Sequence, residues 1–168
     1  TFQDVFGLER VSVVGRDAGR AAALAARIEA ELGVPASAAG PAAVAEADVV
    51  VTCTAATAPL FDGTLVPEHA TVVAMGSHTT DARETDDALA RRATVAVESR
   101  DSAAREAGDV TLAIDSGALA GIEDTVTLAE LVAGTARRRE GAPALFVTTG
   151  MPWQDLVVAS AVAREVLG

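Results

Sequence analysis

The sequence contains no lysine and no tyrosine, a single cysteine and only 3% aromatic residues. The lone Cys53 excludes an internal disulfide, which argues against a disulfide-rich secreted protein and favours a reducing cytoplasm. No apolar run reaches the roughly 18 residues of a membrane-spanning helix, and we expect neither such a helix nor a signal peptide. With so few aromatics, the core must be built from Ala, Val and Leu, which suits helices packed on a buried parallel sheet.

The charge balance is strongly acidic. All 13 basic residues are arginines, and they face 24 acidic residues, which gives a net charge of −11. Nucleic acids and anionic membranes both require a basic face, so neither is expected as a partner. The acidic clusters show no metal-ligand spacing and no paired histidines, so we expect no metal site.

A chain of 168 residues suffices for one domain with a sizeable core. The run "VSVVG" predicts a strand at 11–15, and the segment after it predicts a helix at 17–33. The alternation continues with strands near 34–37 and at 48–54, 71–75, 94–99 and 144–149, and with helices at 41–47, 84–93, 100–107, 127–135 and 151–167. Residues 109–124 fit no pattern. Alternating strands and helices predict an α/β fold with a doubly wound parallel sheet. The strand at 48–54 is apolar on both faces, so we expect it in the middle of the sheet.

Ligands of such sheets bind at the carboxyl ends of the strands, so the loops after residues 14, 52, 75 and 149 are the candidates. The first of these reads Gly15-Arg16-Asp17. In a dinucleotide-binding fold, an arginine here clamps the 2′-phosphate of NADP, whereas an acid accepts from the 2′-hydroxyl of NAD. Arg16 therefore favours NADP. Asp17 suits NAD if it points inward, and it can equally serve as the N-cap of the following helix.

The loop "TCTAATAPLF" at 52–61 consists mainly of small residues. Small side chains let a backbone approach a flat ligand, but they also suit tight packing. Cys53 has no base near it in the sequence, and a buried cysteine is usually structural, so we do not expect a nucleophile.

The loop "GSHTTDARETDD" at 76–87 carries His78, one of two histidines. At the carboxyl edge, an imidazole can exchange a proton with a substrate nitrogen near neutral pH. Alternatively the segment only turns the chain, with its threonines and acids capping a turn and the next helix.

No G-x-G-x-x-G turn, which would bind a pyrophosphate, occurs in the sequence. The segment before residue 11 resembles a helix end and a loop. We therefore expect natural sequence upstream, including a first strand and the glycine-rich loop.

Taken in order, the segments "ADVVVTCTAATAPLFDGTLVPEHATVVAMGSHTTDARETDD", "VAVESRDSAAREAGDV", "LAELVAG" and "LFVTTGMPWQDLVVASAV" resemble the nucleotide-binding domain of the ornithine cyclodeaminase and mu-crystallin family. The resemblance runs from about residue 8 to residue 167. It implies a Rossmann-like domain at 1–150 that lacks its first strand, and a helix at 151–168 leading to a separate domain. The resemblance further implies that this other domain forms a homodimer and binds the substrate carboxylate.

The resemblance also implies roles for individual positions. Arg16 matches the residue that NADPH-preferring members direct at the 2′-phosphate, and Asp155 matches an acid in the last helix. The cofactor contacts would be Gly15, Arg16, Asp17, Thr52, Thr54, Ala55, Gly76, Ser77, Thr149 and Gly150, and His78 would be catalytic.

Three departures bear on the reaction. True ornithine cyclodeaminases have an aspartate where this chain has His78, while Thr80 replaces a frequent proline and Val147 a frequent lysine. Members with "GSH" and a "DARE"-like run resemble reductases of cyclic ketimines such as pyrroline-2-carboxylate. The resemblance thus implies an NAD(P)-dependent, NADP-preferring imine reductase acting on an imine or amino acid. An ornithine cyclodeaminase and a non-catalytic NADPH-binding crystallin-like protein stay open as alternatives.

Overall fold

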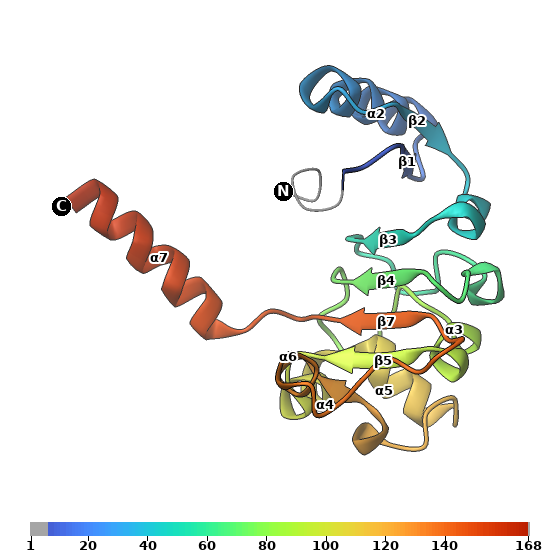
Figure 1. The fold of residues 1–168 in the computed structure, drawn as a ribbon, viewed down its shortest axis with the longest axis vertical. Helices are drawn as coiled ribbons and strands as arrows, with labels where there is room; N and C mark the ends of the chain where they lie inside the picture. Colours follow the sequence, from blue (N-terminus) through green and yellow to red (C-terminus); the bar gives the residue numbers. More distant parts are fainter. Residues whose placement is uncertain (1–6, 168) are drawn as a thin grey trace. The chain divides into compact units, whose positions relative to one another are not determined.

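The computed structural model describes residues 7–167, except for the side chain of Leu167. The helix end expected at the start of the chain falls on residues 1–6, outside the described part, and residues 7–10 have no regular secondary structure. The chain forms two compact units, Thr1–Glu46 and Ala47–Gly168, which are described separately (Figure 1). The expected division at residue 150 stays a prediction. No helix within 7–167 has both the length and the apolar character needed to cross a bilayer.

The first unit contains β1 (Val11–Val14), α2 (Ala18–Leu32), β2 (Ala36–Ala39) and the 3₁₀ helix η1 (Pro41–Glu46). β1 and β2 pair in parallel, and α2 packs against both strands. This confirms the first strand and the first helix. The second strand starts two residues later than expected, because Pro35 has no N–H for the ladder and contributes only its carbonyl oxygen, to Val11 N at 2.9 Å. The helix expected at 41–47 is 3₁₀ rather than α.

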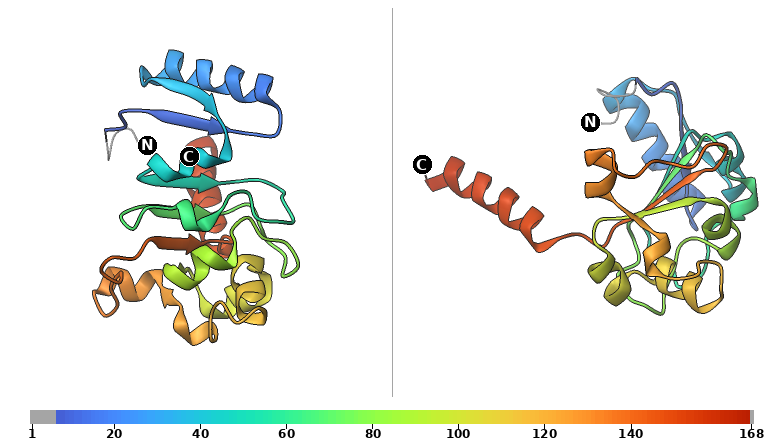
Figure 2. Two further views of the ribbon diagram at one scale, coloured as in Figure 1. Left: turned by 90° about the vertical axis from the view of Figure 1, so that its right-hand side faces the viewer. Right: turned by 60° about the horizontal axis from the view of Figure 1, so that its bottom comes forward.

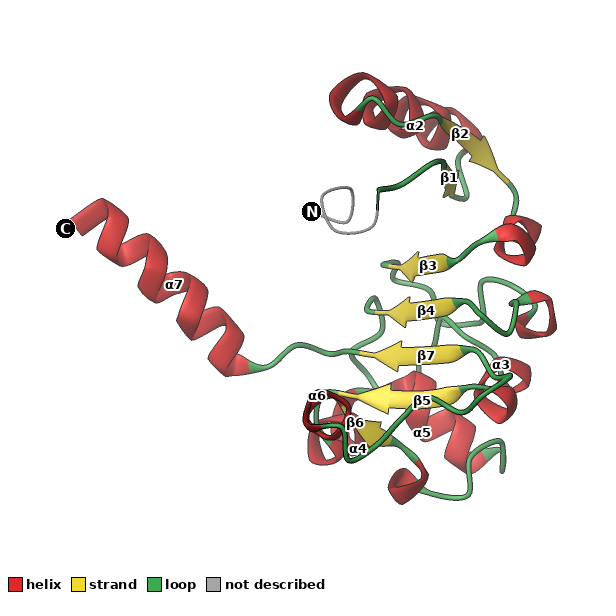
Figure 3. Ribbon diagram, viewed as in Figure 1, coloured by secondary structure: helices red, strands yellow, loops and turns green. Residues whose placement is uncertain are grey.

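The second unit contains a five-stranded sheet, and every pairing in it is parallel (Figures 2 and 3). The strand order is β3 (Val49–Thr52), β4 (Thr71–Ala74), β7 (Ala144–Val147), β5 (Thr94–Val97) and β6 (Val126–Thr127). The α/β class with a parallel sheet is therefore confirmed. The sequence did not predict β6, because two residues are too short to show an alternating pattern.

The expected central position of the strand at 48–54 is wrong for the described residues. β3 has one hydrogen-bonded neighbour there, β4, and so forms an edge of the five-stranded sheet. Val49 and Val51 are 39% and 45% exposed. An apolar run indicates that both faces of a strand are covered. Whether the strand is central or at an edge depends on its backbone hydrogen bonds to neighbouring strands, which the pattern of side chains does not reveal.

The helices of the second unit are α3 (Asp87–Arg92), α4 (Arg100–Glu106), α5 (Gly108–Asp115), α6 (Leu128–Ala133) and α7 (Pro152–Leu167), with short 3₁₀ turns at Gly63–Leu65 and Ile122–Asp124. α3 begins three residues later than expected because Asp86 is its N-cap, accepting from Leu89 N at 2.9 Å. α6 ends early, at Gly134 in the left-handed region (φ 72°). α5 falls mostly in the unassigned stretch, since "GDVTLAID" starts with a poor helix former and contains β-branched residues.

The strand register aligns the carboxyl ends of the five strands. Thr52 pairs with Ala74, Ala74 with Val147, and Val147 with Val97. Val97 in turn pairs with Thr127. The segments that follow these residues therefore leave the sheet along one edge, where ligands of parallel sheets bind.

Glu130 stabilises one end of this sheet. It completes a capping box with Thr127, whose backbone N–H donates to the carboxylate at 2.7 Å, and Arg100 donates to both carboxylate oxygens at 3.1 and 3.2 Å. The Thr127 N–H, followed by the Arg100 guanidinium, lowers the pKa of Glu130 from 4.5 to about 2.

We therefore expect Glu130→Gln to destabilise the protein in a pH-dependent way. A lowered pKa means that the carboxylate stabilises the fold above pH 4.5 and loses this effect as the pH falls toward 2. Urea unfolding of wild type and variant from pH 7 to pH 2 should show a difference that is full above pH 4.5 and disappears near pH 2. Glu106→Gln, at an exposed acid on α4, is the control and should track wild type at every pH. A gap of constant size for Glu130→Gln would contradict the assignment.

Candidate functional site

The predicted site residues are divided between the two units. Gly15, Arg16 and Asp17 follow β1 in the first unit. The remaining predicted residues follow β3, β4 and β7 in the second unit and lie along its carboxyl edge. Each group is described within its own unit.

The loop after β1 carries two charged side chains, Asp17 and Arg16, which differ in their hydrogen bonding. Asp17 is the N-cap of α2, and its Oδ1 accepts from Arg20 N at 2.9 Å. The predicted N-cap role of Asp17 is therefore confirmed. Arg16 is exposed, and among residues 7–167 its guanidinium has no hydrogen-bond or ion-pair partner. Of the two charged side chains on this loop, the one available to a ligand is therefore the positively charged Arg16.

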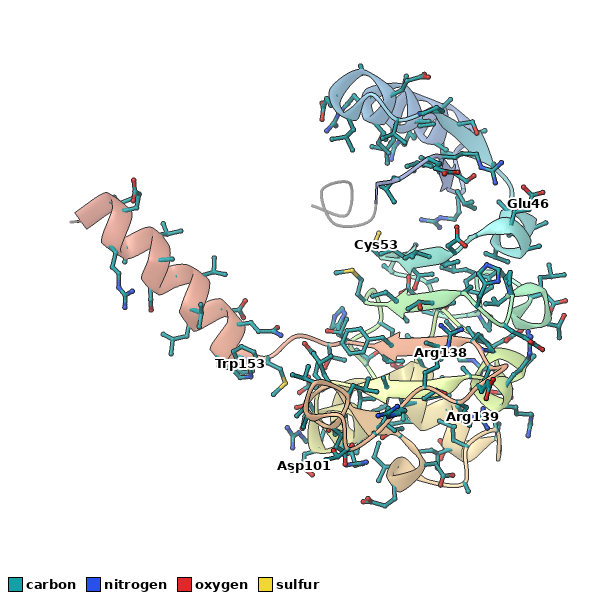
Figure 4. The ribbon with its side chains drawn as sticks, viewed as in Figure 1. Glu46, Cys53, Asp101, Arg138, Arg139 and Trp153 are labelled. Atoms are coloured by element: carbon teal, nitrogen blue, oxygen red, sulfur yellow. The ribbon has the colours of Figure 1, made fainter. Side chains whose placement is uncertain are left out.

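The hydroxyls of the loop after β3 point at a buried acid, Glu84. Thr52 Oγ1 donates to Glu84 Oε2 at 2.8 Å, and Thr54 donates to Oε1 through its Oγ1 at 2.7 Å and its backbone N–H at 2.6 Å. Thr52 is buried, whereas Thr54 and Ala55 are exposed. Cys53, labelled in Figure 4, is exposed as well. Both threonine hydroxyls already donate to Glu84, so a ligand along this loop meets mainly main chain and small side chains. Cys53 is exposed, so burial is no reason for it to be unreactive, and the expectation that it is not a nucleophile stays a prediction.

The loop after β4 approaches the loop after β3 backbone to backbone. Gly76 N donates to Glu84 Oε2 at 2.8 Å. A Cβ at Gly76 would overlap the backbone N and O of Thr54 and approach Glu84 Oε1 to 2.6 Å. Only glycine fits here.

The two residues after Gly76 differ in exposure. Ser77 is 6% exposed, and its hydroxyl donates to the Ala82 carbonyl within the same loop. His78 is exposed, with Nδ1 3.5 Å from the Gly76 carbonyl oxygen. The imidazole is therefore free to meet a ligand at this edge, whereas the Ser77 hydroxyl is already used.

Glu98, at the end of β5, fixes the loop after β7. Its carboxylate accepts from Gly150 N at 3.1 Å and from Gln154 Nε2 at 2.7 Å, and Gln154 Oε1 accepts from Met151 N at 3.0 Å. Gly150 is exposed with φ 81°, a conformation that favours glycine. Thr149 beside it is partly buried, and Asp155 is exposed on α7.

A hollow of about 280 Å³ adjoins this loop. It is mainly apolar, and Trp153 lies at its α7 side (Figure 4). The other lining residues are Glu98, Leu128, Ala129, Val132, Met151 and Gln154.

Asp109 on α5 lies behind the loop after β4. Its Oδ1 accepts from Glu84 N at 3.0 Å and from Thr85 N and Oγ1 at 2.7 and 2.6 Å. Burial raises the pKa of Asp109, and the Glu84 carboxylate adds to the rise. Within the described residues, its buried Oδ2 has no hydrogen-bond partner.

Glu84, Glu98 and Asp109 are not evident as site residues from the sequence. Glu84 was expected at the start of a helix, but it precedes the N-cap Asp86 and its side chain is buried. Its partners at positions 52 and 54 are about 30 residues away, so no local motif links them. The one local signal was the pair of threonines flanking Cys53. Residues 7–167 contain no group of three or more His, Cys, Asp or Glu side chains that could bind a metal.

A parallel α/β sheet with its polar loops gathered at the carboxyl edge is an architecture of the Rossmann-like type. A family model described as the ornithine cyclodeaminase/mu-crystallin family matches residues 1–168, and the chain belongs to that family.

Two curated relatives and one solved structure illustrate the similarity. The chain is 37% identical over 168 residues to the Delta(1)-pyrroline-2-carboxylate reductase of Paracoccus denitrificans, covering 96% of this chain and 52% of that protein. It is 32% identical over 161 residues to the ketimine reductase mu-crystallin of Mus musculus, covering 96% and 49%. The iminosuccinate reductase of Paracoccus denitrificans, solved with NAD+, superimposes with a TM-score of 0.79 at 28% identity, covering 95% of this chain and 57% of that one. The chain thus spans about half the length of the curated relatives it matches.

Proposed function

We propose that the protein is an NAD(P)-dependent reductase that converts a cyclic imino acid, of the pyrroline-2-carboxylate type, to an amino acid. The observation that carries the proposal is the exposed His78 imidazole at the carboxyl edge of a parallel sheet. Family membership supports it, since relatives are named as pyrroline-2-carboxylate and ketimine reductases. An aspartate at position 78 would have favoured the cyclodeaminase alternative.

The residues present fit a dinucleotide. At the β3 and β4 ends, Ala55 is exposed, and Gly76 lets the two loops approach more closely than any other residue would. A flat, extended ligand can therefore lie against main chain. Gly15, Ala55, Gly76 and Gly150 would contact the cofactor through their backbones. Thr52, Thr54 and Ser77 would contribute indirectly, by fixing the loops on which they lie.

Reduction of an imine needs a hydride at carbon and a proton at nitrogen. Reduced nicotinamide supplies the hydride when bound. The protein must orient the substrate and move the proton. His78 and Asp81 are both exposed titratable groups on the loop after β4. His78 lies nearer the strand end, and an imidazole exchanges protons near neutral pH, so we assign it the donation of that proton to the substrate nitrogen.

We further propose a preference for NADPH over NADH. The Asp17 carboxylate already caps α2, while the Arg16 guanidinium is free among the described residues. A free cation suits a 2′-phosphate better than a 2′-hydroxyl.

Arg16→Ala is expected to weaken NADPH binding by about 1.5–3 kcal/mol, the contribution of a hydrogen bond to a charged group. NADH affinity should change little, because NADH lacks the phosphate. Dissociation constants for both cofactors, measured by fluorescence titration, test this. Arg20→Ala, which removes the same charge from the first turn of α2, is the control. Equal weakening of both cofactors by Arg16→Ala would contradict the preference.

The decisive experiment uses protein expressed from its complete natural coding sequence. NADPH oxidation with Delta(1)-pyrroline-2-carboxylate is measured beside ammonia release from ornithine with NAD. We expect oxidation without ammonia release. Ammonia release without net oxidation would replace the proposal with a cyclodeaminase, and cofactor binding without either reaction would favour a crystallin-like binding protein.

A further inference from the structure

Glu84 is a fully buried acid that joins two strand ends. Its relative exposure is 0%, and its carboxylate accepts four hydrogen bonds, of 2.6 to 2.8 Å, from Thr52, Thr54 and Gly76. All four donors are neutral hydroxyl or backbone N–H groups. The segment after β3 and the segment after β4 are therefore held by the same two oxygen atoms.

Such an arrangement opposes folding unless its hydrogen bonds compensate. A buried carboxylate loses its hydration, and most buried acids recover part of that loss from a cation. A leucine or methionine of similar volume would fill the space without this cost. It would, however, leave the Thr54 and Gly76 N–H groups without an acceptor. What the carboxylate adds is a defined distance between two loops.

The main chain at Glu84 is itself fixed. Its N–H donates to Asp109 Oδ1 at 3.0 Å, and its carbonyl oxygen accepts from Leu60 N at 2.9 Å. Thr85 adds two more hydrogen bonds to Asp109 Oδ1. The Glu84 carboxylate therefore extends from a fixed main chain, and its hydrogen bonds set the positions of the two loops.

The two loops are those to which the proposed function assigns cofactor and substrate. Thr54 adjoins Ala55, and Gly76 precedes His78 by two residues. We propose that Glu84 is a positioning residue, which fixes the main chain along the cofactor and sets the place of His78 relative to it. This inference rests on the proposed function.

The test is Glu84→Gln in protein expressed from the complete natural coding sequence. The substitution keeps the volume but replaces one acceptor oxygen with an NH₂ group that faces N–H and O–H donors. We expect NAD(P)H binding about ten-fold weaker or worse, equivalent to about 1.4 kcal/mol, together with a lower kcat for imine reduction. Amide hydrogen exchange at Thr54 or Gly76 should be faster in the free protein.

Glu130→Gln is the matched control. Glu130 also accepts from a threonine N–H and a threonine hydroxyl, but it caps α6, away from both loops. It should lower thermal stability and leave cofactor affinity and kcat as in wild type. If Glu84→Gln behaves in the same way, Glu84 is merely structural and the inference is wrong. If Glu84→Gln does not fold, Thr52→Val removes one of the four donors, and unchanged affinity, kcat and exchange at Thr54 would also overturn it.

The outcome for wild type separates the two proposals. Absence of both NAD(P)H binding and turnover in wild type would overturn the proposed function, and with it the catalytic part of this inference. Normal binding and turnover in wild type, retained in full by Glu84→Gln, would overturn the inference alone.

Discussion

His78→Ala is expected to lower kcat for imine reduction by about 100-fold or more, within the range of about 10²–10⁴ that a positioned acid or base contributes. NAD(P)H affinity should stay within about two-fold of wild type, because an exposed side chain that acts on the substrate nitrogen adds little to cofactor binding. The imidazole is exposed two residues after Gly76, near the start of the loop, and within residues 7–167 its one polar contact is the long one to the Gly76 carbonyl oxygen. Single-turnover reduction, followed by NADPH absorbance, measures the chemical step directly.

His69→Ala provides the comparison. His69 is the other histidine, it is also exposed, and its Nε2 pairs with Asp48 at 3.1 Å beside the amino ends of β3 and β4. It should retain wild-type turnover. Full activity in His78→Ala would remove the histidine from the mechanism. Equal losses in cofactor affinity and in kcat would instead make it a cofactor-binding residue.

Much of the fold was predictable because its determinants are local. The apolar run before Gly15 and the helical spacing after Asp17 each specify their element over adjacent residues, and both were confirmed. The larger errors occurred where the determinant is not local. The edge position of β3 depends on which strand pairs with which, and the buried position of Glu84 depends on partners about 30 residues away in the sequence.

The candidate site shows the same limit at the level of side chains. The strand ends could be located from the sequence, so the loops with Ala55, Gly76 and His78 were found. The direction in which each side chain points could not be predicted from the sequence, because it depends on partners that are distant in the sequence. Thr52 and Thr54 are predicted cofactor contacts, and the structure adds that their hydroxyls donate to Glu84. The roles of the predicted cofactor contacts, and the expected homodimer, stay predictions.

Gly76→Ala is expected to have the second large effect. The added Cβ would overlap the backbone of Thr54, and backbone atoms in a loop fixed by Glu84 cannot rotate away as a flexible side chain can. The two loops must therefore separate. We expect the free energy of unfolding to fall by about 1–3 kcal/mol, as for other overpacked sites. We also expect kcat/KM to fall about 100-fold, since a shift of about 1 Å can have that effect on a reacting geometry.

Gly121→Ala separates this effect from the loss of a glycine as such. Gly121 lies in the same unit, has an extended backbone (φ 178°), and a Cβ there would meet nothing within 4 Å. Stability and activity should both stay at wild-type values. If Gly76→Ala lost stability but kept kcat/KM, the spacing of the two loops would matter only for folding. A parallel loss in both would mean that the reaction requires close approach of the main chains after β3 and β4. Glu84 would hold these two loops together, and Gly76 would leave room for them to approach.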